Sequence, residues 1–196
     1  MIYKIIALMI MIIFYIFYIV KLLLLNNKSI KTNQAGVGNK PKRVLIIERI
    51  MSIATIMTII VQVCSILFVK NYIMTELRIV GIILGVISII FFALATITMK
   101  NSWRVGIPEE KTSLITNGIY KWSRNPAFVG FDLLYCSICL IFCNIPLVIV
   151  SIWAAVMLHL QILQEEVHMH NMFGEEYDNY KKHTLRYFGR RQILVK

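Results

Sequence analysis

Long runs of apolar side chains alternate with short polar segments, and the length of each run predicts a membrane-spanning helix. A helix rises about 1.5 Å per residue and the hydrocarbon core of a bilayer is about 30 Å thick, so about 20 apolar residues cross it. Three runs meet this requirement, with their few charges near the ends: residues 2–25, 45–69 and 79–99. We expect three transmembrane helices in the first half of the chain.

The fourth apolar stretch, residues 127–163, is too long for one span. It is interrupted by Cys143, Asn144, Ile145 and Pro146, and proline does not fit the interior of a regular helix. This pattern predicts a tight helical hairpin. The expected fold is therefore an all-α integral membrane protein with five transmembrane helices, the last two forming the hairpin, followed by a cytosolic amphipathic C-terminal segment.

Composition agrees with lipid as the main solvent. Of the 196 residues, 58% are hydrophobic and only 16% are charged, which is too apolar for an ordinary soluble domain. The net charge of +11 does not indicate nucleic acid, because the basic residues lie between the apolar runs rather than on one basic surface. We expect membrane lipids as the surroundings and no nucleic acid partner.

The basic residues instead predict the topology. Lys and Arg are concentrated in segments 26–46 and 100–126 and in the tail after Gln164, which places all three on the cytoplasmic side. Five spans then give an N-out, C-in arrangement with the active site on the cytosolic side. The richness in Ile, Lys and Asn indicates an AT-rich, bacterial genome, and hence the bacterial cytoplasmic membrane.

Polar and apolar segments also divide the chain into two parts. Residues 1–99 form a three-span scaffold with few polar side chains, joined by a Gly- and Pro-containing stretch, 26–42, that predicts a flexible linker. Residues 100–196 form the catalytic half: a cytosolic loop, the hairpin and an amphipathic helical segment broken at Gly174 that lies against the cytoplasmic membrane face.

Charged residues mark both ends of the hairpin. Arg124 enters it, and Glu165 and Glu166 stand where its second arm leaves the membrane. A short hairpin brings these groups to one level, so they predict a polar pocket over an apolar floor. Asp132 lies deeper, where a charge is either functional or neutralised by a nearby base. Both explanations stay open.

The histidines and cysteines predict no metal site. His168 and His170 are two positions apart and point to different sides of a helix, whereas helical metal ligands are spaced by three or four. Three cysteines share one stripe with no His or acid, and they are better explained by helix packing. His159 is either a buried, hydrogen-bonded histidine or a pocket residue.

Two blocks of residues resemble the signature of the isoprenylcysteine carboxyl methyltransferase family, which is related to the phospholipid methyltransferases. The resemblance covers about residues 116–188 and departs from the family pattern mildly, with Asn125 at a common histidine position and Phe128 at a common tyrosine position. The first block is Asn117-Gly118-Ile119-Tyr120, Ser123-Arg124-Asn125-Pro126, Phe128 and Gly130; the second is Glu165-Glu166, Met169, Phe173-Gly174, Tyr177, Tyr180 and Arg186.

The resemblance implies an enzyme that uses S-adenosylmethionine to methylate a lipophilic small molecule or lipidated substrate, such as a prenylcysteine carboxylate, entering from the bilayer. It assigns catalysis to Arg124 and Glu166. The arginine suits the cofactor carboxylate, and either glutamate suits the ribose diol. The residues expected to bind the cofactor are Tyr120, Arg124, Asn125, Pro126, Glu165, Glu166, Tyr177, Tyr180 and Arg186.

Three other functions are compatible with the pattern. A phospholipid N-methyltransferase would need a base for its amine acceptor. An NADPH-dependent membrane reductase of the sterol reductase type would need more clustered basic residues for the 2′-phosphate than Arg124 and Arg186 supply. A non-catalytic membrane scaffold would keep its activity without Arg124 or Glu166.

Overall fold

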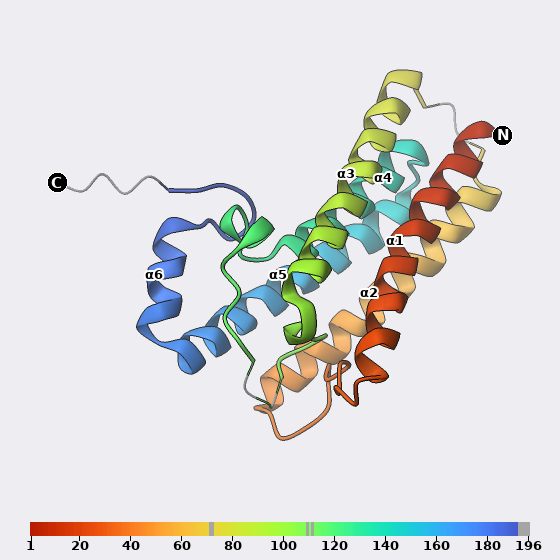
Figure 1. Ribbon diagram of the computed structural model, residues 1–196. Helices are drawn as coiled ribbons and strands as arrows, with labels where there is room; N and C mark the ends of the chain where they lie inside the picture. Colours follow the sequence, from red (N-terminus) through yellow and green to blue (C-terminus); the bar gives the residue numbers. More distant parts are fainter. Residues whose placement is uncertain (71–72, 109, 111, 192–196) are drawn as a thin grey trace.

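The computed structural model describes residues 1–70, 73–108, 110 and 112–191, and shows long helices packed into one bundle (Figure 1). The α-helices are α1 (Ile2–Asn26), α2 (Lys42–Phe68), α3 (Thr75–Met99), α4 (Pro126–Ile141), α5 (Ile145–Phe173) and α6 (Glu175–His183). Two short 3₁₀ helices, η1 (Lys100–Ser102) and η2 (Gly118–Lys121), lie between α3 and α4. The only pairing of extended backbone among the described residues is two isolated bridges.

The all-helical membrane architecture predicted from the apolar runs is confirmed. Four helices are long and apolar enough to cross a bilayer: α1, α2, α3 and α5. The hairpin break also falls where predicted, since α4 ends at Ile141 and the side chain of Asn144 caps α5 by accepting a hydrogen bond from the N–H of Leu147. The first arm, α4, has only 16 residues and is about 24 Å long.

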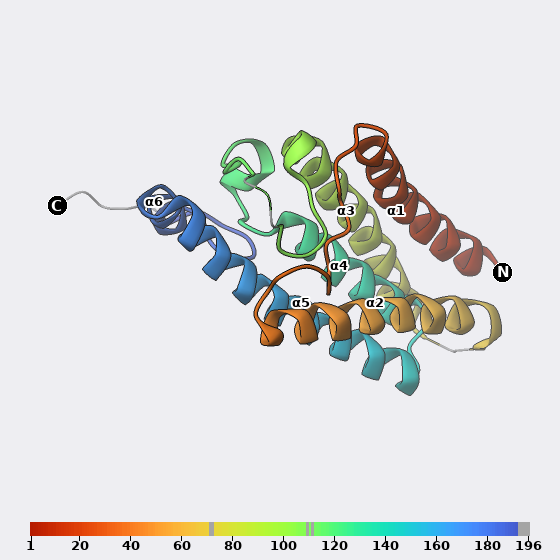
Figure 2. The same ribbon diagram turned by 90° about the horizontal axis from the view of Figure 1, so that it is seen from below.

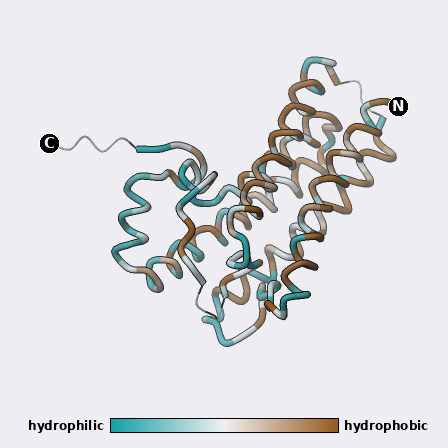
Figure 3. Tube along the Cα trace, in the orientation of Figure 1, coloured by the Kyte–Doolittle hydropathy of each residue, from teal (hydrophilic) through white to brown (hydrophobic). Residues whose placement is uncertain are grey.

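The bundle has two ends. The N-terminus and the α2–α3 and α4–α5 connections lie at one end; the α1–α2 connection, η1, η2 and α6 lie at the other (Figures 1 and 2). Hydrophilic residues gather in the connections and in the C-terminal part, while the long helices are hydrophobic (Figure 3). The segments rich in Lys and Arg therefore share one end of the bundle. Glu109 and Lys111, two charges of the loop before η2, lie outside the described residues.

Helix α4 is enclosed by its neighbours and packs closely on α3 through small residues. At Gly81 a Cβ atom would lie 2.9 Å from the backbone carbonyl of Ser137, and the Ser137 hydroxyl donates to the Gly81 carbonyl at 2.6 Å. Small residues let transmembrane backbones approach in this way. The only exposed residue that the structure shows in α4 is Cys136. Because protein surrounds it, α4 does not need the full length of a lipid-facing span.

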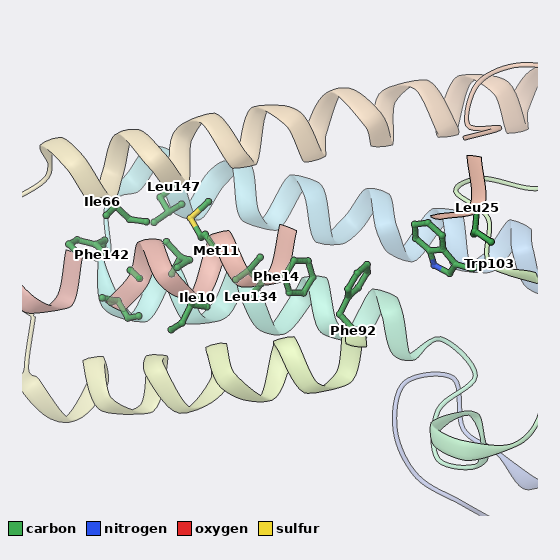
Figure 4. Packing of buried hydrophobic residues seen from close by; sticks show 13 residues of the cluster. Ile10, Met11, Phe14, Leu25, Ile66, Phe92, Trp103, Leu134, Phe142 and Leu147 are labelled. Atoms are coloured by element: carbon green, nitrogen blue, oxygen red, sulfur yellow. The ribbon is translucent and has the colours of Figure 1, made fainter. Parts of the chain in front are cut away.

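Aromatic and aliphatic side chains fill the centre of the bundle (Figure 4). The ring of Phe14 on α1 packs against Phe92 on α3 and Phe131 on α4, with centroids 4.6 and 5.0 Å apart. The outer faces of α1, α2, α3 and α5 expose rows of isoleucines, as expected for helices surrounded by lipid.

The connection between α1 and α2 differs from the flexible linker that the sequence predicts. The carboxylate of Glu48, fully buried on α2, accepts hydrogen bonds from the N–H of Gly36 (2.7 Å) and from Lys40 (2.8 Å). Asn33 and Val105 form an isolated bridge, in which the N–H of Gln34 donates to the Val105 carbonyl at 2.9 Å and the N–H of Val105 donates to the Thr32 carbonyl at 3.0 Å. The stretch is tied to the bundle because one acid inside α2 organises it.

Candidate active site

The hairpin brings Arg124 and Glu166 together, as predicted. Arg124 lies just before α4, and its Nη2 donates to Glu166 Oε1 at 2.6 Å although the residues are 42 positions apart. Arg186 donates to the other oxygen of Glu166 at 2.8 Å. Both Arg124 and Glu166 are largely buried, and Glu166 lies inside α5 rather than at a helix start. One carboxylate thus binds two guanidinium groups, which leaves the trio with a net positive charge.

Arg124 also fixes the chain that follows α6. Its Nη1 donates to the carbonyl of Thr184 at 2.7 Å, and its backbone N–H donates to the carbonyl of Leu185 at 3.1 Å. Asn125 Nδ2 donates to the carbonyl of Arg186, and the Gly189 N–H donates to the Trp122 carbonyl. The segment 184–191, called here the C-terminal strap, is therefore bound to the loop before α4 by backbone groups as well as by charge.

A small cavity of about 110 Å³, lined by both polar and apolar side chains and called here the polar cavity, lies beside this network. Of the residues predicted to bind the cofactor, Tyr120, Arg124, Asn125, Glu165, Glu166, Tyr177 and Tyr180 line it. Pro126 begins α4 and Arg186 contacts Glu166 from the strap, and neither lines the cavity. Small-molecule sites span roughly 300–1,000 Å³, so a cofactor would fit only if the lining moved outward.

The two glutamates differ in their partners. Both oxygens of Glu166 are engaged by arginines. Glu165 accepts one hydrogen bond, from Gln161 at 3.0 Å, and within the described part of the chain no other partner is seen for its carboxylate. Glu165 therefore keeps an acceptor oxygen for a ligand in the cavity, which the sequence could not assign to either member of the pair.

Burial around the cavity changes the acidity of its tyrosines. Loss of water and the nearby Glu166 charge raise the pKa of Tyr177 to about 12. Burial likewise raises the pKa values of Tyr120 and Tyr180 above the ordinary range. The hydroxyl of Tyr180 donates to the carbonyl of Tyr120 at 2.6 Å. These tyrosines stay neutral near pH 7, so they serve as hydrogen-bond donors and packing groups rather than as bases.

A second, larger cavity of about 560 Å³ lies inside the bundle and is lined mainly by apolar side chains. Tyr15 and Ile19 of α1, Met51 and Ile56 of α2, and Phe128 of α4 contribute to its walls. Ile19 and Ile56 are about half exposed on the outer surface of the bundle. The cavity therefore reaches the surface between α1 and α2, the helices predicted to form a scaffold.

Arg104, Gly106 and Glu165 line both cavities, so the polar and apolar spaces meet at these residues. Arg104 is not among the site residues predicted from the sequence. The signal in the sequence was its place between Trp103 and Gly106. In the structure, Gly106 adopts a left-handed backbone (φ 82°), and a Cβ atom added there would lie 2.7 Å from Ala35. That pattern marks a close approach of two chain segments, but it does not reveal which cavity they border.

The other polar candidates lie at or beyond the edge of this site. His168 lines the polar cavity, whereas His170 pairs with Asp178 at 3.0 Å and His159 hydrogen bonds to Tyr187 of the strap. Asp132 lines neither cavity, and among the described residues its Oδ1 has no hydrogen-bond partner. No group of three or more His, Cys, Asp or Glu within the described ranges could hold a metal ion.

The fold and the site together define a helical membrane protein in which a polar cavity at one end of the bundle adjoins a lipophilic cavity within it. Comparison with known proteins then gives the family: the chain belongs to the phospholipid methyltransferase family, whose model matches residues 76–176. Membership of this family makes the protein a membrane methyltransferase. The matched residues run from α3 through α5 to the start of α6.

A named relative points the same way. The chain is 29% identical over 113 residues to Protein-S-isoprenylcysteine O-methyltransferase of Xenopus laevis. The aligned stretch covers 55% of this chain and 39% of the relative, so the chain spans well under half the length of that protein. Together the two findings confirm the predicted relationship to the isoprenylcysteine carboxyl methyltransferases and their phospholipid methyltransferase relatives.

Proposed function

We propose that the protein is an S-adenosylmethionine-dependent methyltransferase of the membrane whose acceptor is lipophilic, such as a prenylcysteine carboxylate. The observation that supports this most is the junction of the polar and apolar cavities at Arg104, Gly106 and Glu165. A methyl donor with polar groups and an acceptor with a long apolar tail need such adjoining spaces. In this proposal α4 also crosses the membrane, which brings the number of spans to five, the N-terminus is outside and the polar cavity faces the cytosol of a bacterium.

The residues present suit the cofactor chemically. The free oxygen of Glu165 would accept hydrogen bonds from the ribose diol, and Tyr120 and Tyr177 offer aromatic surface in the same cavity. Arg124 and Glu166 line this cavity and also hold the strap against the loop before α4. Arg124 would contact the cofactor carboxylate if it exchanged the Thr184 carbonyl for it. S-adenosylmethionine supplies an electrophilic methyl group on a sulfonium, which passes to an acceptor oxygen.

The chain's own contribution is alignment and exclusion of water. When a carboxylate is the acceptor, it gains a methyl group and no proton has to be removed, so the site needs no general base. The negative acceptor and the positive donor lose their charges together, and a dry cavity favours that change. Holding the two reactants in line at the junction supplies most of the acceleration that a site of this kind needs.

Isothermal calorimetry with S-adenosylmethionine on the detergent-purified protein tests the proposal. We expect saturable binding by the wild type, loss of at least about tenfold in affinity in Glu165→Gln, and no change in Glu176→Gln, an exposed glutamate on α6. Binding of NADPH with no response to S-adenosylmethionine would instead indicate a reductase. A folded protein that binds neither compound would indicate a non-catalytic scaffold.

A further inference from the structure

Arg104 lies at the junction of the two cavities with an incompletely satisfied charge. Its side chain is 9% exposed, and its Nη1 donates to the carbonyls of Asn101 (2.6 Å) and Trp103 (2.9 Å). Its Nε is buried, and the described part of the chain supplies no hydrogen-bond partner for it. The guanidinium therefore retains donor capacity inside the protein.

Among the described residues, the acids closest to Arg104 neutralise it only in part. The carboxylate of Glu110 is 3.6 Å from Nη2, beyond normal hydrogen-bond length, and is 60% exposed to solvent. Glu165 lines the same junction, but among the described residues it forms no ion pair with Arg104. A buried guanidinium is costly unless an anion or hydrogen-bond acceptors compensate it. The junction is therefore a site prepared for a negative group.

The other two arginines near the polar cavity do not offer this. Arg124 and Arg186 both bind the carboxylate of Glu166, and Nη1 of Arg124 donates to a backbone carbonyl. Arg104 also sits on a fixed backbone. The Val105 N–H donates to the Thr32 carbonyl at 3.0 Å, and the Ile107 N–H donates to buried Glu48 at 2.7 Å. A cation held this way can orient a bound group.

We propose that Arg104 binds the anionic head of the lipophilic acceptor, so that the site selects acids over neutral or cationic lipids of the same tail. The tail lies in the apolar cavity and the head reaches the junction, next to the polar cavity. This inference rests on the proposed function, because it assigns the acceptor side of the same site. It makes Arg104 a specificity-determining residue, and it favours O-methylation of an acid over N-methylation of an amine.

The test compares two probes with one tail: N-acetyl-S-farnesylcysteine, which carries a carboxylate, and its carboxamide. Binding is followed by intrinsic tryptophan fluorescence, and of the three tryptophans Trp103 lines the apolar cavity. The proteins are the wild type, Arg104→Gln, Arg104→Lys and Arg43→Gln, the last replacing an exposed arginine on α2. Calorimetry with S-adenosylmethionine is run on each preparation.

We expect the wild type and Arg43→Gln to bind the acid at least about tenfold more tightly than the amide. Arg104→Gln should lose this preference through weaker acid binding, with amide binding unchanged. Arg104→Lys should keep part of it, since it retains the charge but not the planar fork. The partial preference supports the proposal even if the glutamine variant does not fold.

A preference for the acid that survives in Arg104→Gln, or equal binding of acid and amide by the wild type, would overturn the proposal. Failure of the wild type to bind S-adenosylmethionine would reject the proposed function, and with it the role of the bound acid as a methyl acceptor. In that case, loss of acid preference in Arg104→Gln would still support an anion site at the junction.

Discussion

Glu48 on α2 accepts a hydrogen bond from the backbone N–H of Ile107, 59 positions later in the chain, at 2.7 Å. The same carboxylate binds Lys40 and the N–H of Gly36, so a single buried acid joins α2, the α1–α2 connection and the loop that carries Arg104. The arrangement links the first half of the chain mechanically to the junction of the two cavities.

Replacing Glu48 should therefore disturb a site that it does not line. In Glu48→Ala, Lys40 is left buried without its partner, and we expect a loss of about 3–5 kcal/mol in the free energy of unfolding. The denaturant-induced transition in detergent, followed by circular dichroism, measures it. Glu76→Gln, at an exposed position of α3, is the control. An unchanged transition in Glu48→Ala would show that the pair contributes nothing net.

Glu166 should be more important for the strap than either arginine that it binds. Glu166→Ala leaves Arg124 and Arg186 unpaired and near each other, so we expect a loss of about 3–5 kcal/mol and faster hydrogen exchange at the Gly189 N–H. Arg186→Ala should cost less, because that side chain is one-third exposed. Equal exchange in the wild type and Glu166→Ala would mean that backbone hydrogen bonds alone hold the strap.

The close contact between α3 and α4 predicts a strong effect of side-chain size at Gly81. A Cβ there meets the backbone of Ser137 at 2.9 Å, which cannot move away as a flexible side chain can. We expect Gly81→Val to cost about 1–3 kcal/mol by overpacking, while Val80→Leu on the exposed face is neutral. Thermal unfolding in detergent compares the two, and equal midpoints would contradict the packing argument.

The raised pKa of Tyr177 predicts alkaline instability of the polar cavity. The folded protein holds this proton up to about pH 12, whereas the unfolded chain releases it near pH 10. Between these values the unfolded state binds fewer protons, so stability falls as pH rises from about 10 to about 12. Unfolding measured from pH 8 to 11 should show a shallower decline in Tyr177→Phe. Parallel curves would exclude this contribution.

The volume of the apolar cavity should limit the length of the acceptor tail that can bind. Thr55 lines this cavity from α2, and a tryptophan there would fill part of the 560 Å³. We expect Thr55→Trp to raise KM for a farnesyl probe about tenfold or more and to leave that for a geranyl probe nearly unchanged. Ile53→Trp, on the exposed face of the same helix, is the matched control. Equal effects on both probes would place the tail elsewhere.

The sequence alone determined the class of fold, because apolar length decides which segments can leave water. The runs before Met99 and the break at Pro146 located the first four helices and the start of α5 within a few residues, whereas α5 continues to Phe173, well beyond the predicted end at residue 163. The hairpin also predicted the meeting of Arg124 and Glu166, since a short connection forces its two arms to run side by side. The resemblance of the two signature blocks predicted the family, which the match of residues 76–176 to the family model confirms.

Only the tertiary structure decided which polar groups remain available to a ligand. Glu165 and Glu166 are adjacent in sequence, yet one keeps a free oxygen and the other is saturated by two arginines. Arg104 gained its importance from packing between two cavities, and Glu48 from contacts with segments far along the chain. The pattern of the sequence predicts which side chains face water or lipid. The pairing of buried charges depends instead on distances between groups far apart in sequence, and these distances exist only in the folded chain.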